Sequence, residues 1–438
     1  MISNIPLISK QLAYYEHNLT GGEENMKFRN VFLKWAVGGL IILLVAAGGW
    51  LGCTQYSLNQ QSRQLAHVQG ELRSAKRAIR YQAMVSRLRE DTIRQFEKNH
   101  GNQDKLVAVS KNPAVNQLLA ALKRRRFVGT ALVVKNGRTI YHRGFGYANF
   151  AKRRRNTANS AFLINSILKS LTGAMLMQEV GKGKLKVSDK LSKFYPKIKG
   201  AQQITLHQML EMTSGLFETR WPKTVTTENQ LLSYVTKHAY FQSQQVGRFN
   251  YQPVNFIILA GVLKKVTGQS YYELFNRRII QKYHLQQTGF LPTLTHIYNG
   301  AIGYGGTLNV RNYRKVNHFT AAGITNQLGV GDVYMSTGDL YRIERRLVTG
   351  RLTSPALTAL QTTPVNSNGI YSGGLYKLRS GIGFYGHGLG NFYEDSLAIS
   401  NNGQDAVVLL SNYFEARTMK IYSGVPVALQ TLDKLVEN

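Results

Sequence analysis

Residues Phe162–Gly173 read FLINSILKSLTG, and the Ser-x-x-Lys pattern inside them decides how the rest of the chain is interpreted. Ser166 and Lys169 are three positions apart, so a helix places both side chains on one face. A serine hydroxyl is a poor nucleophile until a base removes its proton, and a lysine enclosed by apolar groups can be that base. The hydrophobic pattern predicts a helix over 165–179 that carries both residues.

Patterns on either side of this helix indicate a mixed fold. Predicted strands at 128–134 and 139–147 flank an Asn-Gly dipeptide at 136–137, which is typical of a tight hairpin turn. A second hairpin is expected near the C-terminus, between 396–400 and 406–411. Helical patterns dominate the middle of the chain, at 206–211, 229–238, 255–266 and 271–283. We therefore expect an α+β domain whose N- and C-terminal strands share one antiparallel sheet.

Composition limits the classes of partner. The chain has 438 residues, 43% of them hydrophobic, which is enough for one large or two ordinary domains. Its formal net charge of +32 predicts an anionic neighbourhood, either nucleic acid, anionic lipid or an acidic wall polymer. The basic clusters occur without a nucleic-acid-binding motif, so we expect no nucleic-acid partner. Cys53 is the only cysteine, which excludes an internal disulfide and a cysteine-based zinc site, and no metal or organic cofactor is implied.

An uncharged segment predicts a membrane anchor. Residues 35–53 contain no charged side chain, and roughly 20 such residues span a bilayer as a helix. Cations within 27–34 precede the span, which favours a cytoplasmic N-terminus over 1–34 and a single-pass protein whose remainder is extracellular. A cleaved signal peptide is one alternative, although the end of the span lacks a clear cleavage site. A lipidated Cys53 is another.

Three further boundaries follow from the sequence. Residues Gly21–Asn25 can be encoded by a purine-rich run that resembles a bacterial ribosome-binding site, so we expect translation to start at Met26 and 1–25 not to be translated. The polar residues 54–113 contain apolar side chains at three- and four-residue spacing, which predicts a partly helical stalk. Residues 114–438 show no internal repeat and predict one domain.

Within that domain a series of segments resembles one family. They are, in chain order, Gly144–Asn149, Phe162–Lys169, Gly183–Leu191, Ile204–Leu216, Asn250–Gly261, Ser336–Leu340 and Gly386–Gly388. In type and order they are similar to the serine β-lactamase and penicillin-binding-protein-like hydrolases, especially the class C and D-alanyl esterase branch. The resemblance implies a β-lactamase/transpeptidase-like fold with an antiparallel sheet and a helical region.

The resemblance also implies roles for individual residues. Ser166 would be the nucleophile and Lys169 its proton partner. Tyr251 would be the tyrosine of the second motif, placed to pass a proton to the leaving group. His387 would replace the lysine of the third motif, and a histidine there suits an ester better than it suits a carboxylate.

The same comparison implies an oxyanion hole and shows two departures from the family pattern. The hole would combine the amide of Ser166 with a backbone amide after His387, for which Gly388 and Gly390 are the candidates. Pro253 stands where the second motif has an asparagine, and Leu389 stands where the third has a glycine. Both changes argue against efficient β-lactam or peptide recognition but leave the minimal set of groups for ester cleavage.

Location, charge and motif together predict a function. We expect a membrane-anchored serine hydrolase in a Gram-positive-type envelope that cleaves D-alanyl esters of teichoic acid through a Ser166 acyl-enzyme. A D,D-carboxypeptidase or transpeptidase that acts on peptidoglycan stems is the first alternative. A catalytically degenerate wall-binding protein is the second.

Overall fold

The computed structural model describes residues 105–218, 220–307, 310–365, 369–414 and 424–437. The predicted cytoplasmic segment over 1–34, the anchor over 35–53 and most of the stalk lie outside the described residues. Within the described ranges, no helix combines the length and the apolar character needed to cross a bilayer. The membrane helix therefore stays a prediction.

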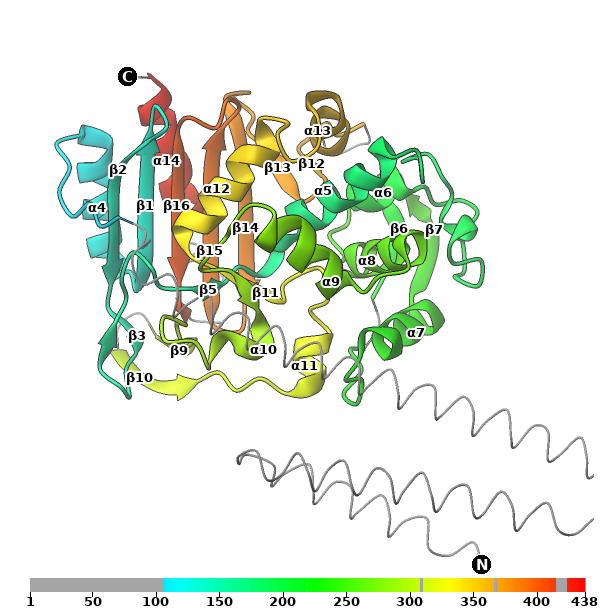
Figure 1. Cartoon of the computed structure of the whole chain (residues 1–438), viewed down its shortest axis with the longest axis horizontal. Helices are drawn as coiled ribbons and strands as arrows, with labels where there is room; N and C mark the ends of the chain where they lie inside the picture. The colour runs from blue at the N-terminus through cyan, green and yellow to red at the C-terminus, as the bar shows by residue number, and fades with distance from the viewer. Residues whose placement is uncertain (1–104, 219, 308–309, 366–368, 415–423, 438) are drawn as a thin grey trace, which may run out of the picture. The chain divides into compact units, whose positions relative to one another are not determined.

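A seven-stranded antiparallel sheet joins the two ends of the described chain. Its strand order is β12-β13-β14-β15-β16-β1-β2, so the first strand lies between the last long strand and its own hairpin partner (Figure 1). The strands are β1 (Gly129–Lys135), β2 (Arg138–Phe145), β12 (Tyr371–Ser372), β13 (Leu375–Lys377), β14 (Gly383–Gly390), β15 (Tyr393–Ser400) and β16 (Ala406–Ser411). The prediction that N- and C-terminal strands share one antiparallel sheet is confirmed.

Backbone conformation explains both ends of the first hairpin. Asn136 and Gly137 have positive φ angles of 50° and 73°, the conformation that a tight two-residue turn needs. The predicted second strand ends early, at Phe145, because Gly146 has a φ of 66° and turns the chain. A Cβ on Gly146 would lie 2.9 Å from the Val128 side chain, so only glycine fits this turn.

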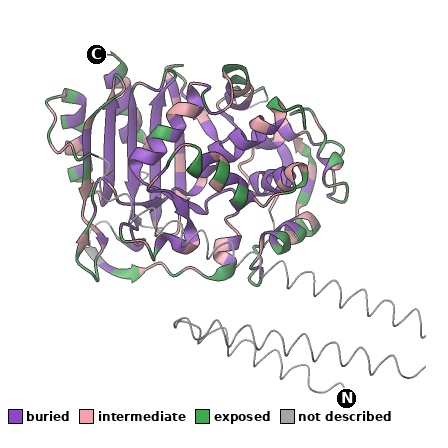
Figure 2. Cartoon of the chain, in the orientation of Figure 1, coloured by how far each residue is buried: buried purple, intermediate pink, exposed green. Residues whose placement is uncertain are grey.

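Each face of the sheet is covered by helices. The helices α4 (Pro113–Arg124) and α14 (Gly424–Glu437) pack together on one face, through an apolar cluster that includes Leu118 and Leu432. The other face packs against α5 (Leu168–Gly181) and α12 (Thr337–Val348). Every residue of β15 and β16 is buried as a result, and these strands are purple throughout in Figure 2.

A helical region lies beside the second face of the sheet (Figure 1). Its elements are α6 (Leu206–Leu210), α7 (Glu228–His238), α8 (Val254–Thr267), α9 (Tyr271–Phe275), α10 (Leu291–Leu294), α11 (Ala321–Thr325), α13 (Pro355–Thr362) and the short 3₁₀ turn Leu191–Lys193. The predicted helix over 271–283 is instead α9 followed by a π-helical turn at Asn276–Gln281. Helix α8 is buried along Val254–Leu263 and packs on α5, so α5 is enclosed by the sheet and by other helices.

Ten short strands lie outside the large sheet among the described residues, and one of them leads into the start of α5. They are β3 (Tyr147–Asn149), β4 (Arg154–Arg155), β5 (Phe162–Leu163), β6 (Ser214–Phe217), β7 (Tyr240–Val246), β8 (Gly289–Phe290), β9 (Tyr304–Thr307), β10 (Val310–Val316), β11 (Val333–Met335) and β17 (Tyr413–Phe414). Strand β5 pairs with β11, and the Ile164 amide then donates to the Val333 carbonyl at 3.0 Å. This pairing holds the residues immediately before Ser166 against the core.

Backbone pairing begins before the predicted domain boundary at residue 114. The Val107 amide donates to the His142 carbonyl at 3.0 Å, and the His142 amide donates to the Val107 carbonyl at 2.8 Å. Residues ahead of α4 therefore already belong to the packed structure.

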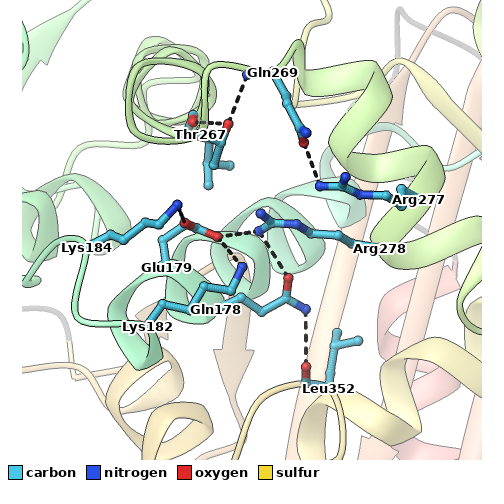
Figure 3. Close-up of polar contacts among 10 residues, drawn as sticks. Gln178, Glu179, Lys182, Lys184, Thr267, Gln269, Arg277, Arg278 and Leu352 are labelled. Atoms are coloured by element: carbon cyan, nitrogen blue, oxygen red, sulfur yellow. Dashed lines mark hydrogen bonds and ion pairs between the residues drawn. The ribbon is translucent and has the colours of Figure 1, made fainter.

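The C-terminal end of α5 is held by buried charge. The Glu179 carboxylate has no exposed side-chain surface and lies 2.6 Å from Arg278 Nη1, 2.8 Å from Lys182 Nζ and 3.7 Å from Lys184 Nζ (Figure 3). Burial acts to raise the pKa of Glu179, but bonds and charges from Lys182 and Arg278 outweigh it and hold the pKa below its usual range. We call these four residues the Glu179 cluster.

Candidate active site

The Ser-x-x-Lys pair meets as the sequence predicts. Ser166 lies on a single 3₁₀ turn, η1 (Asn165–Ile167), that leads directly into α5, and Lys169 lies in the first turn of α5. Lys169 Nζ donates to Ser166 Oγ at 2.7 Å. Ser166 is partly exposed whereas Lys169 is 1% exposed. The pair therefore combines a solvent-accessible hydroxyl with a buried amine at proton-transfer distance.

The Lys169 amine is surrounded by dipoles and a ring. Its Nζ lies 3.4 Å from the Val330 carbonyl oxygen and 5.2 Å from the centre of the Tyr251 ring. Among the described residues, no carboxylate lies within ion-pair distance of this nitrogen. The part of the chain that the structure describes also contains no group of three or more His, Cys, Asp or Glu arranged to hold a metal ion.

Tyr251 lies beside Lys169, as expected for the second motif. The Asn250 amide donates to the Met212 carbonyl at 2.8 Å, which fixes the segment just ahead of α8. The Tyr251 ring packs edge-on against Tyr371, with centroids 5.7 Å apart. Burial, and then the neighbouring Tyr251 phenol, raises the pKa of Tyr371 well above its usual range. Tyr371 thus stays neutral next to a tyrosine that lies close to the lysine.

The structure does not bring the fourth predicted residue, His387, to this group. Side chains alternate along a strand, and a Cβ on Gly388 would lie 2.5 Å from the Ile164 carbonyl oxygen, so Gly388 faces η1. His387 therefore faces the opposite side of β14, where its Nε2 lies 3.5 Å from Glu394 Oε1. Glu394 in turn lies against the start of α14, because a Cβ on Gly424 would meet its carboxylate at 2.8 Å.

The two glycines predicted for the oxyanion hole do lie beside the serine. The close approach of Gly388 to Ile164 leaves no room for a side chain on this face of β14. The Gly390 carbonyl accepts a hydrogen bond from Asn165 Nδ2 at 3.4 Å. Leu389 alternates to the far face with His387, so it does not narrow the space next to Ser166. Donation from these glycine amides to an oxyanion stays a prediction.

Sequence reasoning missed a link between the serine turn and the sheet. Asn165 has a φ of 42°, a left-handed conformation that asparagine adopts more readily than most residues. Its Nδ2 donates to Asp395 Oδ2 at 2.8 Å. Burial raises the pKa of Asp395 well above its usual range, although the bond from Asn165 acts against it. No local pattern marked this bond, because it joins two segments that are far apart in the sequence.

Sequence reasoning also missed Glu218, which follows β6. Its amide donates to Gln252 Oε1 at 3.2 Å, next to Tyr251. Its Oε2 atom is buried and has no hydrogen-bond partner among the described residues. Burial raises the pKa of Glu218 to about 7, while the nearby Lys169 charge acts to lower it. No sequence motif marks this residue, because its place depends on how β6 and the second motif pack.

Comparison with known proteins gives one family. A family model described as Beta-lactamase matches residues 105–422. PbpX of Bacillus subtilis (strain 168), which carries the name of a penicillin-binding protein, is 28% identical over 313 residues, covering 71% of this chain and 76% of that protein. A teichoic acid D-alanine hydrolase of Staphylococcus aureus is 26% identical over 326 residues, covering 72% of this chain and 80% of the relative.

Solved structures share the fold. A crystal structure of FmtA from Staphylococcus aureus superposes with a TM-score of 0.64 at 23% identity, covering 77% of this chain and 94% of that one. The D-amino acid amidase from Ochrobactrum anthropi SV3 superposes with a TM-score of 0.59 at 18% identity, covering 74% and 98%. At these identities the likeness concerns the fold alone.

Proposed function

The chain belongs to the beta-lactamase family, whose members here are serine hydrolases, and from that premise we propose that it is a D-alanyl esterase acting on teichoic acid. The observation that carries the proposal is the 2.7 Å contact between Lys169 Nζ and Ser166 Oγ in a chain similar to a teichoic acid D-alanine hydrolase. The net charge of +32 supports it, because a cationic protein concentrates a phosphate polymer near its surface.

The proposed reaction proceeds through an acyl-enzyme. Ser166 Oγ attacks the ester carbonyl carbon while the Lys169–Tyr251 pair takes the hydroxyl proton. The resulting oxyanion is stabilised by backbone amides next to η1 and β14. The C–O bond of the ester then breaks, and the polymer hydroxyl leaves with the proton that Tyr251 returns. Water attacks the D-alanyl-serine ester in the same way, which releases D-alanine and restores Ser166.

His387 has no part in this proposed set. Its family role would need a ring that faces η1, and in β14 a shift of one residue reverses the face on which a side chain lies. Gly386 and Gly388 occupy the face that contacts the serine turn. We propose that Lys169 and Tyr251 carry the proton transfers without a third-motif side chain.

Membrane attachment is part of the proposal. The uncharged segment 35–53 would anchor the protein, with the hydrolase domain outside the cell. The test is fractionation of cells that express the full chain, followed by protease treatment of intact protoplasts. Retention in the membrane fraction with a protease-accessible domain supports the anchor, whereas release into the medium contradicts it.

D-alanine release tests the activity. The full-length protein in detergent is incubated with D-alanylated lipoteichoic acid, beside its Ser166→Ala variant, and free D-alanine is measured. Release by the wild type alone supports the esterase. Equal release by both proteins, or none by either, contradicts it.

One relative favours a second candidate, a D,D-peptidase that acts on peptidoglycan stems, because PbpX carries the name of a penicillin-binding protein. Penicillin would then form a stable adduct with Ser166, which intact-protein mass spectrometry detects. Absence of the adduct in a preparation that releases D-alanine favours the esterase.

A further inference from the structure

Glu218 has a carboxylate oxygen that is buried without a hydrogen-bond partner, and the residue lies near Lys169. The residue is half-buried, and its Oε2 atom is enclosed without a hydrogen-bond donor among the described residues. An unpaired buried carboxylate is costly, so such groups in folded proteins normally have a partner or belong to a binding site.

The backbone around Glu218 is fixed to the second motif. The Glu218 amide donates to the Gln252 side chain, and Gln252 is adjacent to Tyr251. Asn255 connects β6 to the second motif by two further hydrogen bonds. Its side chain accepts from Ser214 Oγ at 2.6 Å and donates to the Gln252 carbonyl at 3.0 Å. Glu218 is therefore held on the same wall of the site as Tyr251.

Among the described residues, no cation lies at hydrogen-bond distance from the buried Oε2 of Glu218. The chain has 55 lysines and arginines against 23 acidic residues, so cations are not scarce. Glu179 shows what this chain does with a carboxylate that needs only internal pairing, because Arg278 and Lys182 both lie within 2.8 Å of it. Lys169 is near enough to influence Glu218 electrostatically, yet its bond goes to Ser166.

A cationic substrate group would complete the pairing. In an aminoacyl ester the ammonium nitrogen is bonded to the carbon next to the carbonyl, which places it about 2.5 Å from the carbon that serine attacks. A substrate that acylates Ser166 therefore carries its ammonium group close to the reacting carbon, and Glu218 is a carboxylate near enough to feel the charge of the neighbouring Lys169.

We propose that Glu218 binds the α-ammonium group of the acyl half of the substrate, and so makes the enzyme select aminoacyl esters over simple acyl esters. This inference rests on the proposed esterase function and identifies the ammonium group as the part of the substrate that the site recognises. A charge-assisted bond of this kind contributes about 10- to 100-fold in specificity.

Two esters that differ only in the ammonium group test the inference. The full-length protein in detergent hydrolyses the D-alanyl and the propionyl ester of glycerol, and kcat/KM is measured for each. We expect the wild type to prefer the D-alanyl ester, and Glu218→Gln to lower kcat/KM for that ester about 10- to 100-fold with the propionyl value within about 3-fold. Glu218→Asp should keep part of the preference.

A matched control separates recognition from general damage. Glu273→Gln makes the same change at an exposed residue of the α9 capping box. Glutamine can also accept the hydrogen bond of a capping box, so both rates should stay unchanged. Thermal melting of each variant checks that the fold is retained.

Three results would overturn the inference. Equal losses on both esters in Glu218→Gln would mean that Glu218 takes part in the hydrolysis itself. An unchanged D-alanyl preference would mean that it takes no part in recognition. A wild type that cleaves the propionyl ester but not the D-alanyl ester would reject the inference alone, whereas no cleavage of either ester or of lipoteichoic acid would reject the proposed function as well.

Discussion

Glu179 and Glu218 are two carboxylates of the same domain with opposite surroundings. Glu179 closes the C-terminal end of α5 with three cations around it, and the net effect lowers its pKa. Glu218 lies near the opposite end of that helix, where Lys169 bonds to a serine and burial raises the Glu218 pKa to about 7. One helix thus has a completed charge cluster at one end and an incomplete one at the other. Incomplete pairing beside a partly exposed hydroxyl is what distinguishes a site for a ligand from a structural contact.

The largest effect is expected at the incomplete end. Lys169→Met keeps a long apolar side chain in the buried position but removes one member of the Lys169–Tyr251 pair that takes the serine proton, so D-alanine release should fall about 10³-fold. Lys182→Met removes a cation from the other end of the helix and should keep most of the activity. A Lys169→Met rate within about 10-fold of the wild type contradicts a role for Lys169 in the proton transfer.

Loss of the acid in the completed cluster should affect stability instead. Glu179→Gln leaves Arg278, whose side chain is 12% exposed, without its counter-charge, and should lower the free energy of unfolding by about 3 kcal/mol. Urea unfolding measures the loss, while activity per folded molecule should be unchanged.

The pH dependence of this loss has a definite sign. The folded-state pKa of Glu179 is lowered, so its stabilisation is complete above the unfolded carboxyl pKa of about 4.3 and disappears as the pH falls through the folded value. Wild type and Glu179→Gln should therefore converge in stability in acid. A difference that does not shrink as the pH is lowered below about 4.3 would contradict the ion-pair explanation.

A third carboxylate sharpens the comparison, because Glu344 is enclosed like Glu179 but meets a hydroxyl rather than a cation. Its Oε1 lies 2.5 Å from Ser170 Oγ, which also lies 2.7 Å from the Ile167 carbonyl oxygen, and burial raises the Glu344 pKa to about 8. A neutral carboxyl can donate to Ser170 while Ser170 donates to Ile167, so both bonds are satisfied.

The raised pKa predicts a loss of stability with rising pH. The unfolded carboxyl ionises near pH 4.3 while folded Glu344 stays protonated up to about 8, so unfolding becomes easier as the pH rises across this interval. Melting temperatures of the wild type should fall between pH 5 and 8 more steeply than those of Glu344→Gln. Parallel slopes would show that Glu344 is not the group responsible.

The smallest effect is expected at the edge of the Glu179 cluster. Lys184 is half-exposed and its Nζ lies 3.7 Å from the carboxylate, so Lys184→Ala should change the free energy of unfolding by no more than about 0.5 kcal/mol. A loss above about 1 kcal/mol in urea unfolding would mean that all three cations act as one network.

Local signals explain the parts of the fold that the sequence predicted. The Asn-Gly turn at 136–137 and the apolar period over 165–179 depend on neighbouring residues, and both elements formed as expected. The sequence did not predict strand β14, because four of its eight residues are glycines, which are depleted in strands. Its glycines reflect a close approach to η1 that only the folded chain reveals.

The residues of the candidate site also differ in how far local sequence determines their positions. Ser166 and Lys169 are three residues apart, so their meeting depends on one helical turn. The face on which His387 lies depends on the register of β14, and a shift of one residue reverses it. Glu218 and the Asn165–Asp395 bond depend on contacts between distant segments, which no local pattern encodes.

The position of β1 has a consequence for how the chain is made. Gly129 pairs with Ser411 and Val134 with Ala406, so two neighbouring strands of the sheet come from the two ends of the domain. The chain must be almost fully synthesised before β1 finds its neighbour, and contacts so far apart in sequence form slowly. A ribosome that stops before β16 leaves β1 with an open edge that invites aggregation.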